Sequence, residues 1–180
     1  MARKLIAAWG LLGVIALLSQ AILRLTPFAI EAVRSDLSTG QWIGLVVWVA
    51  FMAHAEGYRG FHSKLSPRVV SRAAYLLTGK LTPLRVIFAP FFCTRLFGAS
   101  SRGMWTSRIL LSGIFCLIVI VRNLDQPLRG IIDCGVVVGL GIGLASMIYY
   151  ASRALSGRPS PADPDLPPDE VAAAVATAPP

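Results

Sequence analysis

The residues best suited to chemistry in this chain lie in one short run, HAEGYRGFH. His54, Tyr58 and His62 follow one another at intervals of four, so they share one face if the run is helical. Two imidazoles on one face could bind zinc, copper or a haem. The two histidines are eight residues apart, about 12 Å along a helix axis, so one ion cannot bridge them without a break in the helix. Glu56 points elsewhere, towards Arg59.

Three interpretations of this cluster stay open. In the first, the run is the polar end of an apolar helix, with an internal Glu56–Arg59 pair and two polar histidines. In the second, the histidines bind a metal or haem, although the run is not HExxH and the chain contains no CxxC. In the third, the cluster handles protons or a substrate. We favour the first interpretation and predict no catalytic residue, no cofactor and no metal.

A second pair of ionisable residues, Arg129 and Asp133, lies four residues apart at the start of an apolar segment. Ionisable groups close to hydrocarbon are candidates for function because they are costly to place there. Near a membrane interface, a half-solvated ion pair with a structural role explains the same spacing. We therefore predict a membrane ion pair here and favour the structural role.

Three glycines repeat at every fourth position in the same segment: Gly135, Gly139 and Gly143. This spacing places small residues on one stripe of a helix, where another helix can approach closely. The pattern predicts tight helix packing. The partner is either the first apolar segment, which contains Gly10 and Gly13, or a second copy of the chain.

Apolar helices must position these residues, and the composition indicates that the helices lie in a membrane. The 180 residues are 55% hydrophobic and only 14% charged, whereas a soluble domain has about 25% charged residues. Each crossing of a bilayer needs roughly 20 apolar residues. We predict an all-α integral membrane protein with four transmembrane helices, at about 5–25, 41–60, 105–124 and 128–151, within a membrane domain of residues 1–155.

The first apolar segment has an alternative interpretation. Ser19 and Ala21 have the spacing of a signal-peptide cleavage site. The apolar character continues beyond them through Ile22, Leu23 and Leu25. We therefore favour an uncleaved first helix.

The stretch 57–108 contains nine Lys and Arg residues and no Asp or Glu. Basic loops between hydrophobic segments lie on the cytoplasmic side. With four helices, this rule places 13 of the 17 basic residues in the cytoplasm, together with both termini. The net charge of +8 then reflects orientation, and we predict no nucleic-acid partner because the loop has no recognised reader motif. The nine residues are Arg59, Lys64, Arg68, Arg72, Lys80, Arg85, Arg95, Arg102 and Arg108.

Two parts of this basic loop have internal order. Ser66 and Pro67 resemble an N-cap and first helical position, and Arg68 and Arg72 then share a face, which predicts a short amphipathic helix at 66–78 with both arginines facing anionic lipid. The segment 81–97 is apolar but contains two prolines and two arginines. Because arginine costs roughly 2.5 kcal/mol or more at mid-membrane, we predict an interfacial or re-entrant segment. If it crosses instead, the chain has five helices and an external C-terminus.

Residues 156–180 are rich in Pro and Ala and contain four acidic residues. They show no apolar periodicity, so we predict a disordered tail. One hypothesis is that this tail folds back onto Arg68 and Arg72 and competes with anionic lipid for them. The alternative is a solubilising tail without contacts.

The runs EGYRGFHSKLSPRVVSRA and PLRGIIDCGVVVGLG resemble a family of small bacterial inner-membrane proteins without an assigned function. The resemblance covers roughly residues 50–145. It implies a bacterial integral membrane protein, and it implies no activity.

Together these observations favour a non-enzymatic accessory or assembly protein of the bacterial inner membrane. It would pack through its glycine faces, bind anionic lipid, and associate with a membrane-protein partner or with a second copy. The alternative is a small proton-coupled transporter or carrier, with His54, Glu56, Arg129 and Asp133 facing a cavity. A third possibility is a membrane enzyme that acts on lipid, with His54 and Glu56 as acid and base.

Overall fold

The chain is helical throughout the part that the structure describes. The computed structural model describes residues 1–158 and 160–170, and these residues contain no strand. The prediction of an all-α chain is therefore confirmed. In chain order the elements are α1 Ala2–Arg34, α2 Thr39–Met52, the π-helix η1 Ala53–Leu65, α3 Ser66–Thr78, α4 Pro83–Ile87, α5 Ala89–Cys93, α6 Ser101–Arg122 and α7 Leu128–Leu155.

Three helices of the described residues are long and apolar enough to cross a membrane: α1, α6 and α7. They contain 33, 22 and 28 residues, and a crossing needs roughly 20. The predicted second crossing, 41–60, is divided between α2 and η1. Because α2 contains only 14 residues, it is too short to cross by itself. The fold is thus compatible with a multi-pass membrane protein.

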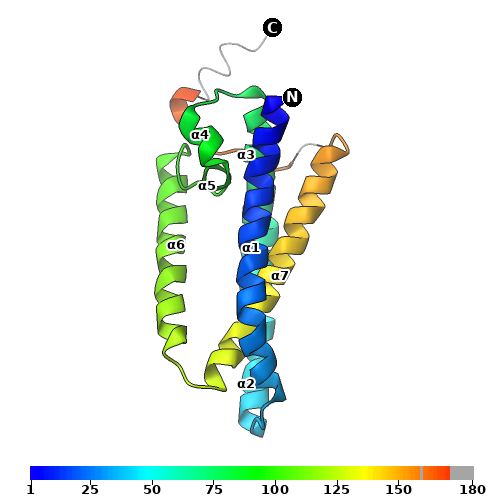
Figure 1. Cartoon of the computed structure of the whole chain (residues 1–180), viewed down its shortest axis with the longest axis vertical. Coiled ribbons are helices and arrows are strands. Elements are labelled where there is room, and N and C mark those ends of the chain that lie inside the picture. The colour runs from blue at the N-terminus through cyan, green and yellow to red at the C-terminus, as the bar shows by residue number, and fades with distance from the viewer. Residues whose placement is uncertain (159, 171–180) are drawn as a thin grey trace.

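The chain reverses direction between α1 and α2. Ser38 begins α2 with a reciprocal cap, in which its hydroxyl accepts from the Gln41 amide and the Gln41 side chain accepts from the Ser38 amide. Such a cap satisfies two backbone N–H groups that the first turn leaves free. From there α2, η1 and α3 follow one another without a break and return to the end where the chain starts (Figure 1). Arg3 contacts this returning end by donating to the carbonyls of Leu77 and Gly79.

The π-helix η1 was not expected from the sequence. It extends over 13 residues, whereas most π-helical segments are single turns. The sequence pattern predicted that Ser66 would be the N-cap of a new helix. That prediction is wrong, because η1 continues directly into α3, and the Ser66 hydroxyl donates to the Gly143 carbonyl at 3.5 Å instead.

The segment 81–97 forms the two short helices α4 and α5, each of five residues. Pro83 begins α4 behind a cap from Thr82, and Pro90 lies at the start of α5. Five helical residues extend about 7.5 Å, so neither helix can cross a bilayer. We call α3, α4, α5 and the residues that connect them to α6 the cap, which lies at the same end of the molecule as the N-terminus (Figure 1).

α7 is the central helix of the bundle. It packs against α1, α2, η1 and α3. α6 has few contacts with the bundle and stands apart from it along most of its length (Figure 1). Residues 108–120 of α6 are all exposed, on every side of the helix.

Buried apolar side chains form two cores. The smaller one lies between α1, α2 and α7, around Ala29, Leu45 and Ile131. The larger one joins α1 and α7 to the cap, and its buried members are Val14, Val69, Val70, Ala73, Leu76, Ala89, Phe92, Cys93, Met147 and Leu166.

Leu166 belongs to the tail that the sequence predicted to be disordered. The structure instead packs residues 160–170 against the cap. Ser160 donates to the Pro67 carbonyl, and Ser71 donates to the Ala162 carbonyl. The prediction of disorder is wrong for this segment, because charged and polar anchors replace the missing apolar periodicity. The rest of the predicted tail, 171–180, lies outside the described residues.

Candidate functional site

The face predicted for His54, Tyr58 and His62 is present on η1. The rings of His54 and Tyr58 stack with centroids 6.1 Å apart, and those of Tyr58 and His62 stack at 5.5 Å. A π-helix has more than four residues per turn, so positions four apart stay in register along its axis. His62 also reaches α7, where its Nδ1 lies 3.0 Å from the Ser146 hydroxyl. Only this histidine of the two joins η1 to α7.

Glu56 does not pair with Arg59, so the predicted internal ion pair is wrong. Its side chain faces Gly139 on α7, while Arg59 is exposed. Among the described residues, Glu56 Oε2 is buried and has no hydrogen-bond partner. The π-helical winding rotates residues three apart away from each other, which explains why the α-helical spacing failed here. A buried carboxylate oxygen without a partner is costly, and this one lies at the contact between two helices.

The glycine stripe of α7 packs against α2 and η1. A Cβ at Gly135 would collide with the Trp48 indole, and one at Gly143 would collide with the Phe61 ring. Trp48 Nε1 also donates to the Ile132 carbonyl at 3.1 Å. The prediction of tight packing thus acquires a partner that neither proposed alternative named. We call the contact of α7 with α2 and η1 the seam. It extends from Trp48 on α2 to Ser146 on α7.

The glycines of α1 serve a different contact. A Cβ at Gly10 would press on Cys93 and Ala89, and one at Gly13 would collide with Pro90. α1 therefore receives the short helix α5 of the cap on this face. Close approach there lets α5 lie against α1, with no side chain at either glycine between them.

Arg129 and Asp133 lie close together in the structure, although their contact is loose. Arg129 Nε is 3.9 Å from Asp133 Oδ2, and the guanidinium lies 3.7 Å above the Phe28 ring of α1. Within the described residues, neither of these two atoms has a hydrogen-bond partner. Asp133 is buried at the junction of α1 and α7.

Arg72 lies inside the cap, not on a lipid-facing surface, and its side chain is fully buried. The predicted basic face of Arg68 and Arg72 is therefore wrong for Arg72, whereas Arg68 is partly exposed. The guanidinium carbon lies 4.0 Å above the Phe92 ring. Burial lowers the pKa of Arg72 to about 10, so the group stays charged at neutral pH.

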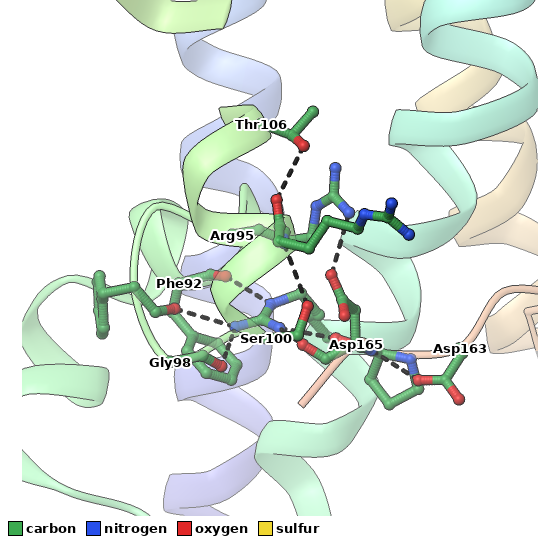
Figure 2. A network of polar contacts seen from close by, with 12 residues as sticks. Phe92, Arg95, Gly98, Ser100, Thr106, Asp163 and Asp165 are labelled. Carbon is green, nitrogen blue, oxygen red and sulfur yellow. Dashed lines mark hydrogen bonds and ion pairs between the residues drawn. The ribbon is translucent and has the colours of Figure 1, made fainter. Parts of the chain in front are cut away.

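Backbone carbonyls surround the Arg72 guanidinium. Within the described residues its Nε donates to Phe92 and its Nη2 donates to Phe97 and Gly98, all in the cap. Its Nη1 donates to Pro164 and Asp165, both in the tail. Figure 2 shows these carbonyls converging on one point between the cap and the tail. One cation thus fixes the end of α5, the following loop and the tail together.

Two further arginines of the cap pair with tail carboxylates. Arg85 Nη2 donates to Glu170 and its Nη1 donates to the Lys80 carbonyl. Arg95 Nη1 lies 3.1 Å from Asp165 Oδ2 (Figure 2). The side chains of both arginines are nearly buried, with 8% and 13% of their surface exposed. The hypothesis that the tail folds back onto basic residues thus fits Arg72, but the ion pairs fall on Arg85 and Arg95.

The ion pairs lower the pKa values of the two tail acids. Burial by itself would raise the pKa of Asp165, but hydrogen bonds from Ser100 and Arg95 and the charges of Arg95 and Arg72 outweigh it, so the pKa lies below its usual value. Burial likewise opposes a lower pKa at Glu170, and Arg85 and Tyr75 overcome it. Both groups are therefore carboxylates at neutral pH.

Sequence reasoning missed Arg85, Arg95, Asp165 and Glu170 as members of one site. The signal was present in part: two arginines inside an apolar segment require counter-charges, and the chain has few acidic residues to supply them. Metal binding finds no support in the geometry, since no group of three or more His, Cys, Asp or Glu side chains among residues 1–158 and 160–170 is placed to hold an ion.

The arrangement therefore holds two tail carboxylates at the cap and one carboxylate at the seam. Comparison with known proteins adds no assignment: no family model matches the chain, and no curated protein and no solved structure matches it.

Proposed function

We propose that the chain is an integral protein of a bacterial inner membrane with four crossings. α1, α6 and α7 supply three of them. α2 and η1 supply the fourth, because they follow each other without a break from Thr39 to Leu65. Four crossings leave both termini and the cap on one side, and the basic residues of the cap assign that side to the cytoplasm.

We propose further that the protein is a non-enzymatic accessory or assembly factor that binds anionic lipid. The observation that carries this proposal is the charge difference between the two ends of the described chain. The far end has three exposed basic residues, Arg24, Arg34 and Arg122, and three exposed acids, Glu31, Asp36 and Asp125. The cap end has two exposed acids in the tail, Asp163 and Asp169, and a marked excess of exposed basic residues: Arg3, Lys4, Lys64, Lys80, Arg102 and Arg158.

Apolar side chains surround this basic end. They are exposed on α4, α5 and the start of α6, at the depth where lipid headgroups would meet the cap. Basic side chains beside such residues favour an anionic leaflet through charge and apolar burial together. The residues are Leu84, Ile87, Phe88, Phe91 and Trp105.

The lipid proposal is tested with two triple variants of equal charge change. K64Q/K80Q/R102Q removes charge from the cap end, and R24Q/R34Q/R122Q removes it from the far end. In native mass spectrometry from mild detergent, we expect wild-type protein and the far-end variant to retain phosphatidylglycerol in preference to phosphatidylcholine. The cap-end variant is expected to lose this preference. Equal retention by all three proteins would contradict the proposal.

The accessory role requires a partner, and we assign its contact to α6. This helix is exposed around its whole circumference from 108 to 120, so its own bundle uses none of that surface. The proposed occupant is a transmembrane helix of another membrane protein, because only an apolar helix fits beside α6 within the bilayer.

Site-specific photocrosslinking tests this contact. Phe115 on α6 and Val47 on α2 are similarly exposed, at 67% and 63%, so they form a matched pair. We expect a crosslinker at Phe115 to yield one discrete adduct with a membrane protein that also co-migrates in native gels, and a crosslinker at Val47 to yield none. An adduct with a second copy would replace the partner by a homo-oligomer, and equal labelling at both positions would contradict the proposal.

A second candidate function is a small proton-coupled carrier. The observation that favours it is Glu56, whose Oε2 is buried at the seam without a partner among the described residues. A carboxylate in such a place can bind and release a proton if the helices around it move. A pH-dependent solute flux in proteoliposomes that Glu56→Gln abolishes would establish the carrier and displace the accessory role.

A further inference from the structure

Three buried or nearly buried arginines of the cap come from separate parts of the chain, and all three contact one segment, the tail. Arg72 lies on α3, Arg85 on α4, and Arg95 two residues after α5. Their charges are close enough to influence one another. The stretch 57–108 that contains them has no acidic residue, and Asp165 and Glu170 of the tail supply the carboxylates. Without the tail, the arginine cluster would be a buried group of cations.

We propose that this arginine cluster is a binding site for a phosphate group, and that the tail occupies it as an internal competitor. The phosphate belongs either to the headgroup of an anionic phospholipid or to free phosphate. The inference rests on the proposed function only in placing the cap beside an anionic leaflet.

The chemistry of the cluster favours phosphate. Guanidinium groups present forked N–H donors that match carboxylate and phosphate oxygens equally well. The carboxylates of Asp165 and Glu170 therefore stand where phosphate oxygens would bind. Both arginine side chains are nearly buried while the tail is in place.

Arg72 shows that the cluster can release the tail without losing its own position. Its Nε and Nη2 donate to carbonyls of the cap, and these contacts do not involve the tail. Its Nη1 donates to the tail carbonyls of Pro164 and Asp165. If the tail leaves, the side chain remains fixed, and Nη1 becomes available to a phosphate oxygen at the same place.

The backbone also indicates that the tail contact is under tension. Arg95 has φ +63° and Asp165 has φ +52°. These values lie in the left-handed region, which is unfavourable for most residues other than glycine and less so for Asp. Arg95 thus adopts a costly conformation next to its ion pair with Asp165. Such conformations persist only while surrounding contacts maintain them and concentrate at binding sites and switches. Release of the tail would relax Asp165.

The test uses full-length protein and two double variants of equal charge. D165N/E170Q removes the two carboxylates that pair with Arg85 and Arg95 and keeps the side-chain shapes. D163N/D169N removes two exposed carboxylates of the same segment, and an asparagine at 163 can still accept from the Asp165 amide as Asp163 does. Binding of short-chain phosphatidylglycerol, and separately of inorganic phosphate, is measured by calorimetry in detergent.

We expect D165N/E170Q to bind the phosphate-bearing ligand at least about tenfold more tightly than wild type, and D163N/D169N to bind it as wild type does. Adding R85Q/R95Q should abolish the gain. A gain for the lipid alone identifies a headgroup site, and a gain for both ligands identifies a phosphate site. Equal binding of both ligands by wild type and both double variants would overturn the proposal.

Hydrogen exchange of the wild-type protein provides a second test that needs no variant. Saturation with the phosphate-bearing ligand should increase amide exchange in 160–170 and leave α7 unchanged. Ligand binding with the tail still protected would overturn the proposal. The inorganic phosphate arm requires no membrane, so it can succeed even if the lipid preference of the exposed basic residues fails.

Discussion

The cap and the seam differ in whether their buried charged groups have polar partners. In the cap, Arg72 is fully buried and each of its three guanidinium nitrogens donates to a carbonyl, while Arg85 and Arg95 each contact a carboxylate. At the seam, Glu56 is held against a glycine, with Oε2 unpartnered within residues 1–158 and 160–170. Polar contacts of the arginines thus add to the apolar core of the cap, whereas the seam depends mainly on close approach at the glycines.

The difference indicates where each region can change. A satisfied buried cation stabilises only while its partners stay in place, so the cap responds to anything that competes for those partners. A carboxylate without a partner favours its own neutralisation or exposure, so the seam responds to protons or to movement of α7.

The largest expected effect is the loss of Arg72. Arg72→Met removes the donor group of five carbonyls, of which only those of Phe92 and Asp165 keep another donor among the described residues, and we expect the free energy of unfolding to fall by about 3–5 kcal/mol. Arg68→Met is the control, because Arg68 is partly exposed and should change stability by about 0.5 kcal/mol at most. Thermal unfolding in detergent measures the stability of both variants. Equal stability would show that buried Arg72 contributes no more than partly exposed Arg68.

The next effect concerns the glycine stripe. Gly143→Ala places a methyl group against the Phe61 ring, whereas a methyl group at Gly141 meets nothing within 4 Å. We expect Gly143→Ala to destabilise the protein by about 1–3 kcal/mol through overpacking. Gly141→Ala, on the same helix, should stabilise it by up to about 1 kcal/mol. Thermal unfolding of the two variants in one detergent shows whether each substitution raises or lowers the stability. Destabilisation by both would mean that the seam does not depend on close approach.

A smaller effect is expected at Glu56. Glu56→Gln removes a charge that has no buried partner, so we expect a gain of about 1 kcal/mol in unfolding free energy at neutral pH. Glu31→Gln, at an exposed position, should leave stability unchanged. A loss of stability in Glu56→Gln would show that the carboxylate has a partner at the seam. The seam would then resemble the cap in this respect.

The smallest effect is the pH response of the tail. The pKa values of Asp165 and Glu170 lie below their ordinary values of 3.8 and 4.5. Their contribution is therefore complete above those ordinary values and declines as the pH falls through the lowered pKa values. We expect amide exchange in 160–170 to increase in that acidic range. Tail protection that persists at the lowest pH would contradict the role of the carboxylates.

Parts of this structure could be predicted from the sequence because they depend on local pattern. The apolar runs of α1, α6 and α7 are long enough to cross a bilayer by count alone. The spacing of Gly135, Gly139 and Gly143 predicts close packing, and the four-residue intervals of His54, Tyr58 and His62 place their rings in one stack. Helical periodicity and residue size determine such features before any partner is known.

Other parts could not be predicted because they depend on residues distant in the chain. The helical winding from Ala53 to Leu65 rotated Glu56 away from Arg59 and towards α7. Arg72 was expected on a lipid surface, since on helix 66–78 it shares a face with Arg68, and only the approach of 160–170 and of the loop after α5 buries it.

By itself, the sequence determined the helical class, the long apolar helices and the excess of basic residues in 57–108, since these follow from composition and short-range spacing. The tertiary structure alone decided which carboxylate meets which arginine, which helix fills the glycine stripe, and that the tail belongs to the cap. The physical reason is that a buried charge is tolerated only where partners converge on it. The carboxylate partner is 85 residues away along the chain for Arg85 and 70 residues away for Arg95.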